Sequence, residues 1–311
     1  MGVEQPDPVR PSKLSLVVAP SLVLLQASSL QVGSAVAKHT YGVISPTALA
    51  GMRLVFSAGL LCLLVRPRLR QITVQQWRAV ILLGVVFAGM NMAYFQAIRH
   101  LPLGVASTLE LLGPLLLSVA LSRRLQHLLS GMLAVASVLL LTAPGGELSA
   151  LGICLGLLAA LCRAAYVVLS RRVGALFADW TGLTVALVIG ACIVAPIAGV
   201  TDGAEVAAHP KVLVTGLFVA LLSSLIPYSL DMVTLRRIDV RAFGVLLALS
   251  PAVAVGVGFF LLDEHLTLRQ VCAIALIMIS TAWAVVVQPS AAPISSSDST
   301  PSVDERHKPP V

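Results

Sequence analysis

The sequence predicts an all-α polytopic membrane protein, with ten transmembrane helices arranged as two inverted five-helix repeats. Three observations predict this fold class: long apolar runs, a one-sided distribution of Lys and Arg around them, and a weak internal similarity. Hydrophobic residues make up 58% of the chain and charged residues only 11%, and the mean hydropathy is +0.95. Soluble domains carry about 25% charged residues, so polar groups cannot cover this surface and lipid must do so.

Apolar runs bounded by charged residues, Pro or Gly define the spans, since roughly 20 apolar residues cross a bilayer. They are Leu14–Val36, Pro46–Leu64, Ala79–Ile98, Pro102–Leu121, Leu128–Leu141, Ala150–Ser170, Thr181–Val200, Val212–Val233, Ala242–Leu261 and Arg269–Val287. The fifth is short, so a buried or re-entrant segment is the alternative there. The first exceeds the roughly 7–15 apolar residues of a signal peptide, and we expect a retained first helix.

The Lys and Arg residues predict the orientation of the chain. With a cytoplasmic N-terminus, fifteen of the 21 lie on the cytoplasmic side and four on the opposite side, while Arg53 and Arg163 lie inside the membrane. Because cytoplasmic loops carry an excess of these residues, we expect both termini to be cytoplasmic in an inner (plasma) membrane. The same short loops explain the net charge of +7 without a nucleic-acid partner.

A shift of 137 residues aligns the chain with itself. It places Arg99–Gly104 on Arg236–Arg241 and Pro114 on Pro251. Because five spans separate the two copies, they would run in opposite senses across the bilayer. Inverted repeats of this kind are a plan of secondary transporters, whose substrate site lies near the midplane. Chance similarity between apolar segments is the alternative.

The chain therefore divides into four predicted parts. These are a cytoplasmic N-terminus (1–13), a first five-helix repeat (14–141), a second five-helix repeat (150–287) and a cytoplasmic tail (288–311). The tail is rich in Pro, Ser and Asp and cannot bury enough apolar surface to order itself, so we expect disorder there.

Four charged residues lie within the spans: Arg53, Glu110, Arg163 and Asp231. Each costs about 2.5–3.5 kcal/mol at a helix centre, so each needs either an internal partner or a function. Arg53 could bind a substrate carboxylate or neutralise Glu110. Arg163 could be a structural partner or contact the substrate. Asp231 lies nearer the end of its span, where a cap or snorkelling role competes with function.

Glu110 is the strongest site residue by its position. It lies near the middle of the fourth span on a stripe with Ser107, Pro114 and Ser118, at spacings that share one helix face. The stripe is typical of a wall of a water-filled cavity. A desolvated carboxylate there could load and release a proton during a transport cycle.

Uncharged polar residues extend this picture. Gln31 lies in the first span, and Asn91 and Tyr94 are i, i+3 neighbours in the third. Interhelical hydrogen bonds, worth roughly 0.6–2 kcal/mol each, are the alternative to ligand contact for all three. Gly152 and Gly156 form a small-xxx-small pair that favours close helix packing.

Several functions find no support in the chain. The six histidines fall in loops and the five cysteines fall in apolar runs without metal-type spacing, so we expect no haem, metal or other cofactor. No P-loop, HExxH or GxSxG motif is present, and we expect a protein that is not an enzyme.

Several segments resemble the EamA type of the drug/metabolite transporter superfamily, in particular its bacterial amino-acid exporters. They are Gly89–Tyr94, Leu101–Ala106, Leu109–Pro114, Ser122–Arg124, Ile226–Met232 and Phe243–Ala252. The likeness covers nearly all of residues 14–287. It implies export of small amino acids of the threonine or homoserine kind from the bacterial cytoplasm, by proton antiport, through two inverted five-helix repeats.

The resemblance also implies a site. The positions that match residues recurring in these exporters are Gln31, Arg53, Asn91, Glu110 and Tyr228. Asp231 stands where they have glutamate, and Arg163 departs from an expected aromatic residue. We therefore expect the substrate and proton site to be formed by Glu110, Arg53, Asn91, Gln31, Tyr228, Asp231, Tyr94 and Arg163. A drug or nucleotide-sugar carrier of the same fold, or a non-transporting membrane receptor, is the alternative.

Overall fold

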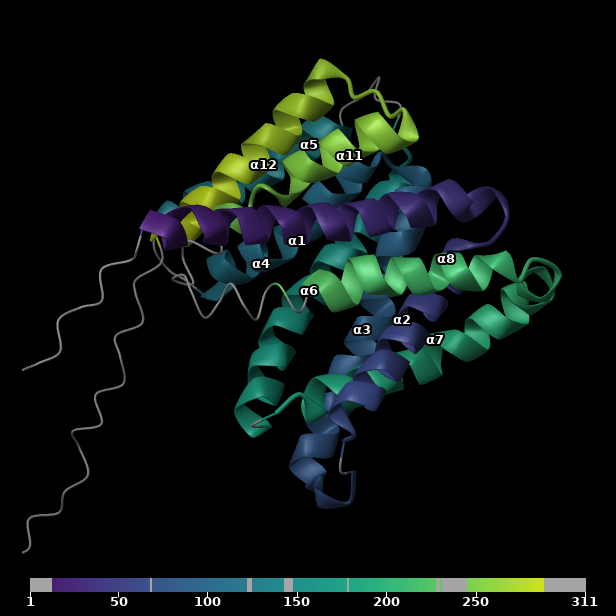
Figure 1. The fold of residues 1–311 in the computed structure, drawn as a ribbon. Helices are drawn as coiled ribbons and strands as arrows, with labels where there is room; N and C mark the ends of the chain where they lie inside the picture. Colours follow the sequence, from purple (N-terminus) through teal and green to yellow (C-terminus); the bar gives the residue numbers. More distant parts are fainter. Residues whose placement is uncertain are drawn as a thin grey trace, which may run out of the picture.

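The computed structural model describes residues 13–67, 69–121, 125–142, 148–177, 179–227, 230 and 245–287. Every regular element in these ranges is a helix, as Figure 1 shows. The first half of the chain contains α1 (Lys13–His39), α2 (Pro46–Val65), α3 (Val74–His100), α4 (Leu103–Leu121) and α5 (Leu125–Thr142), with short 3-10 turns η1 (Thr40–Gly42) and η2 (Leu69–Gln71). The second half contains α6 (Ala150–Leu176), α7 (Thr181–Ala208), α8 (Lys211–Ala220), the π-helix η3 (Leu221–Leu225), α11 (Ser250–Leu262) and α12 (Leu268–Val287).

Helices of membrane length confirm the broad fold class. In the described part of the chain, six helices are long and apolar enough to cross a bilayer, and three shorter apolar helices accompany them. Each predicted span coincides with a described helix, although the end of the eighth and the start of the ninth lie outside the described residues. The count of ten crossings and the inverted repeat stay predictions.

Several helices extend beyond the limits that hydropathy predicts. The third span was expected from Ala79, but α3 begins at Val74 because Thr73 and Gln76 form a capping box that satisfies the first backbone N–H groups. The seventh span was expected to end at Val200, yet α7 continues to Ala208. Asp202 in this extension accepts hydrogen bonds from the backbone and hydroxyl of Ser45. Polar contacts thus stabilise turns that are too polar to count as membrane spans.

The closest helix crossing lies between α4 and α6. A Cβ atom added at Gly113 would run into the carbonyl oxygen of Ala160, so only glycine permits this approach. One turn away, a Cβ at Gly156 would lie 2.6 Å from Leu109, and one at Gly152 would lie 2.7 Å from Leu101. The predicted role of the Gly152 and Gly156 pair in close packing is confirmed.

The two halves of the chain interlock. Helix α2 packs on α7, α4 on α11 and α5 on α12, while α3 lies against both α6 and α7. In Figure 1, α1 runs between α11 and α8, and it contacts both of them and η3. The buried side chains form one continuous core that spans both halves.

An ion pair joins three elements at one end of the bundle. Lys38 Nζ, near the end of α1, lies 2.6 Å from Glu264 Oε1 and donates to the carbonyl of Leu101 at 2.6 Å. The other carboxylate oxygen of Glu264 accepts from the backbone N–H of Leu103 at 2.7 Å. This network connects α1, the start of α4 and the segment that follows α11.

Gly113→Ala is expected to lower the stability of the protein by roughly 2 kcal/mol, because α4 and α6 must separate to admit the methyl group. SDS titration of the purified protein in detergent measures the change. Gly174→Ala in α6 is the control, since a Cβ there meets nothing within 4 Å, and it should be neutral or stabilising by up to about 1 kcal/mol. Equal effects of the two substitutions would contradict the close crossing.

A double-mutant cycle of Lys38→Met and Glu264→Gln is expected to give a coupling energy of about 1–2 kcal/mol, because both groups are largely buried and each also bonds the backbone at the start of α4. The exposed Glu205 and His209 pair on α7 is the matched control, with a coupling below about 0.5 kcal/mol. Unfolding of each variant in detergent measures both values. Coupling no larger than in the control would show that the Lys38 network does not hold the bundle together.

Candidate functional site

Gln31 lies at the centre of a buried polar network. Its side chain is 1% exposed, and Nε2 donates to Ser107 Oγ at 2.9 Å and Ser250 Oγ at 3.3 Å. Its Oε1 accepts from the hydroxyl of Tyr94 at 3.5 Å. These contacts join α1, α3, α4 and α11, so the network connects both halves of the chain through side chains alone.

Glu110 forms an ion pair with Arg163. The atoms Oε1 and Nη1 lie 3.4 Å apart, across the close crossing of α4 and α6. The Arg163 guanidinium also lies 5.5 Å from the ring centre of Tyr166, within range of a cation–π contact. The Glu110 and Arg163 side chains are 19% and 35% exposed, so neither member of the pair is fully buried by the helices around it.

Arg53 binds the π-helix η3. Its Nη2 donates to the carbonyl of Ser223 at 2.7 Å, and its Nε donates to Ser224 Oγ at 3.1 Å. Its guanidinium carbon lies 5.7 Å from the ring centre of Phe95. π-Helical turns occur often at functional sites, and here the turn directs a carbonyl and a hydroxyl toward a membrane arginine.

Asn91 has an unused acceptor in the interior. Its Nδ2 donates to the carbonyl of Phe87 one turn back, at 2.8 Å. Its Oδ1 is buried and has no hydrogen-bond partner among the described residues, although the residue is only 4% exposed. An unpaired buried acceptor is costly, and a substrate ammonium group could satisfy it.

Two predicted site residues, Tyr228 and Asp231, lie outside the described residues, as does the side chain of Ser118. Of the other six, Gln31 and Tyr94 share one network, Glu110 and Arg163 form an ion pair, and Arg53 and Asn91 each have hydrogen-bond partners of their own. Among the described residues, no group of three His, Cys, Asp or Glu side chains could hold a metal ion.

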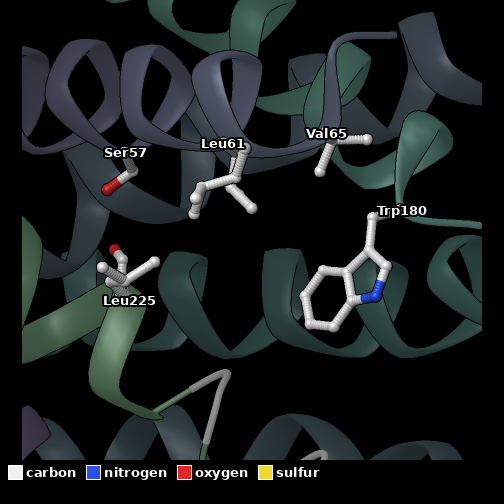
Figure 2. Close-up of a pocket in the computed structure, with 7 residues that line it drawn as sticks. Ser57, Leu61, Val65, Trp180 and Leu225 are labelled. Atoms are coloured by element: carbon white, nitrogen blue, oxygen red, sulfur yellow. The ribbon is translucent and has the colours of Figure 1, made fainter.

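A pocket of about 250 Å³ lies between α2, η3 and the start of α7. Figure 2 shows Ser57, Leu61 and Val65 of α2 along one edge, with Leu225 and Trp180 across from them. The sequence alone did not predict this pocket. The i+4 steps from Arg53 to Ser57, Leu61 and Val65 were the available signal for α2, whereas nothing local marks Trp180.

A bundle of membrane-length helices with charged and polar groups in its interior is the architecture of a multi-pass membrane transporter. The description "EamA-like transporter family" belongs to the family model that matches residues 19–143 and 150–286. Because these matches cover most of the chain, the protein belongs to the EamA-like transporter family.

Individual relatives agree with this family. The threonine/homoserine exporter RhtA of Salmonella typhimurium is 34% identical over 263 residues, covering 83% of this chain and 88% of that protein. RhtA of Escherichia coli is 33% identical over the same shares. A solved crystal structure matches with a TM-score of 0.57 and 20% identity, over 88% of this chain and 98% of its own, which indicates the shared fold. These relatives indicate a transporter rather than an enzyme.

Gln31→Leu is expected to cost about 2 kcal/mol of stability, because it leaves the partners on α3, α4 and α11 without the central amide. Gln96→Leu is the control, since Gln96 makes one hydrogen bond, to Thr47 Oγ1 at 3.0 Å, and should cost about 1 kcal/mol. SDS titration in detergent measures both. A smaller loss of stability in Gln31→Leu than in Gln96→Leu would contradict the central place of Gln31 in the network.

Proposed function

We propose that this protein is an inner-membrane secondary transporter that exports small amino acids of the threonine or homoserine kind, or related metabolites, by proton antiport. The observation that carries the proposal is the Glu110 and Arg163 ion pair, 3.4 Å long and only partly buried between two membrane helices. Relatives that are 34% identical and named threonine/homoserine exporters support the class of cargo.

The ion pair can couple a proton to a cationic amine. An unprotonated Glu110 is held by Arg163, and either a proton or a substrate ammonium group can compete for the same carboxylate. When a proton binds, it removes the negative charge that attracts the ammonium group, so proton binding and amine release are linked. One carboxylate used alternately by two cations suffices for exchange.

The remaining polar residues would hold the rest of the amino acid. The open acceptor of Asn91 suits an ammonium group, and the planar guanidinium of Arg53 suits a carboxylate. Gln31 and Tyr94 would line the cavity where their network joins the two halves. Tyr228 and Asp231 are proposed as further contacts, on the resemblance alone.

The pattern of helix packing supports ten spans in two inverted repeats. Suppose that α1, α2, α3, α4 and α5 correspond in order to α6, α7, α8, α11 and α12. Equivalent helices then contact each other in three pairs: α2 with α7, α4 with α11 and α5 with α12. The contact of α3 with α6 has its counterpart in α8 with α1, and that of α4 with α6 in α11 with α1. The family model matches two successive segments of the chain, which also supports the repeat. Both termini would be cytoplasmic, as the Lys and Arg distribution favours.

Glu110→Gln is expected to reduce proton-driven efflux of labelled threonine and homoserine at least about tenfold, because the amide cannot exchange a proton or pair with an ammonium group. Efflux from loaded cells, with and without a protonophore, measures the change. Glu205→Gln is the control, since Glu205 is exposed on α7. Normal export by the Glu110→Gln variant would exclude the proposed role.

A further inference from the structure

The pocket between α2, η3 and α7 has a polar end and an apolar body. Ser57 and Ser224 lie at the polar end, and Leu61, Val65, Leu225 and Trp180 supply apolar walls. Ser224 Oγ accepts from Arg53 Nε at 3.1 Å, so a fixed cation stands directly behind the polar end.

The hydroxyl of Ser57 is the second observation that indicates a ligand. Ser57 is 4% exposed, and its Oγ makes no hydrogen bond with any residue that the structure describes. Serine in a helix commonly donates to the carbonyl four residues earlier, as Ser137 does to Leu133 at 2.8 Å. The donor of Ser57 is instead left for a molecule in the pocket, and a buried unmade hydrogen bond is costly until such a molecule arrives.

We infer that this pocket is a binding subsite for a small amphiphilic carboxylate, specifically an amino acid with an apolar side chain. The carboxylate accepts from the Ser57 hydroxyl beside the Arg53 charge, and the side chain lies among Leu61, Leu225 and Trp180. The volume of about 250 Å³ is below the roughly 300–1,000 Å³ of pockets for drug-sized ligands, so it suits a single amino acid.

The apolar walls also select among amino acids. A branched apolar side chain gains from leaving water in such a pocket, whereas a hydroxyl group there loses its hydrogen bonds to water without replacement. The subsite therefore prefers leucine-like over threonine-like cargo. This inference goes beyond the proposed function, because it adds apolar amino acids to the threonine-like cargo proposed above, and it rests on that function only for the role of the ligand as cargo. Binding to the pocket is measurable without transport.

Trp180 provides the readout for a binding experiment. In a Trp77→Phe, Trp283→Phe background, Trp180 is the remaining tryptophan of the three in the chain. Its fluorescence in the purified, detergent-solubilised protein is titrated with leucine, threonine, 4-methylpentanoate (the carboxylate without the amine) and isopentylamine (the amine without the carboxylate). Leucine and 4-methylpentanoate should give saturable changes, isopentylamine none, and threonine should bind at least about tenfold more weakly than leucine.

Two variants test the assigned contacts. Ser57→Ala should lower the affinities for leucine and 4-methylpentanoate about tenfold, because one hydrogen bond to a charged group is lost. Ser137→Ala should leave both affinities unchanged. Val65→Thr adds a hydroxyl to an apolar wall at nearly constant size. It should reduce the ratio of the leucine affinity to the threonine affinity.

Three outcomes would overturn the inference. They are an affinity for isopentylamine equal to that for 4-methylpentanoate, an affinity for threonine equal to that for leucine, or the same leucine affinity in the Ser57→Ala and Ser137→Ala variants. A fourth is a fluorescence change caused by added phosphatidylglycerol and not by leucine, which would make the pocket a lipid site. Normal efflux by Glu110→Gln with intact leucine binding at Trp180 would instead reject the proposed antiport and leave the subsite standing.

Discussion

The close crossing of α4 and α6 is the constraint on which the proposed site depends. At Gly113 the absence of a side chain lets α4 approach the backbone of α6 at Ala160, nearer than any other residue type would allow. One turn before it, Glu110 then faces Arg163 across the same crossing. A membrane-embedded carboxylate and guanidinium are costly when separate, so the glycine contact and the ion pair stabilise the same geometry.

The interior of the bundle contains two kinds of polar contact, one fully hydrogen-bonded and one not. The Gln31 network is buried and satisfied by side chains from four helices, which favours a fixed junction between the halves. The Glu110 pair and the Ser57 pocket are different, because the first is partly exposed and the second leaves a donor unpaired. A transporter needs fixed junctions between helices beside polar side chains whose hydrogen bonding is incomplete. Its substrate can then replace the weak contacts that these side chains make within the protein.

Arg53 joins α2 to η3 beside the Ser57 pocket. It lies on α2 and binds the π-helix η3, which carries Ser224 of the pocket, while Ser57 follows one turn further along α2. The π-turn is a local departure from regular hydrogen bonding, and it is followed closely by Pro227, which cannot donate to a helix. A ligand that draws on the Arg53 charge would therefore act on an irregular part of the eighth span.

Much of the fold followed from the sequence because hydrophobicity and the cost of a buried charge are local properties. Apolar runs predicted the positions of the described helices, and the rarity of charge within them singled out Arg53, Glu110 and Arg163. The ends of α3 and α7 were missed, since hydropathy is blind to the capping by Thr73 and the bond of Asp202 to Ser45. Only the tertiary structure decided that Arg163 pairs with Glu110, that Lys38 meets Glu264 and that Trp180 and Ser57 line one pocket. Those contacts depend on how each helix rotates and crosses its neighbours, which is determined by packing between residues far apart in the chain.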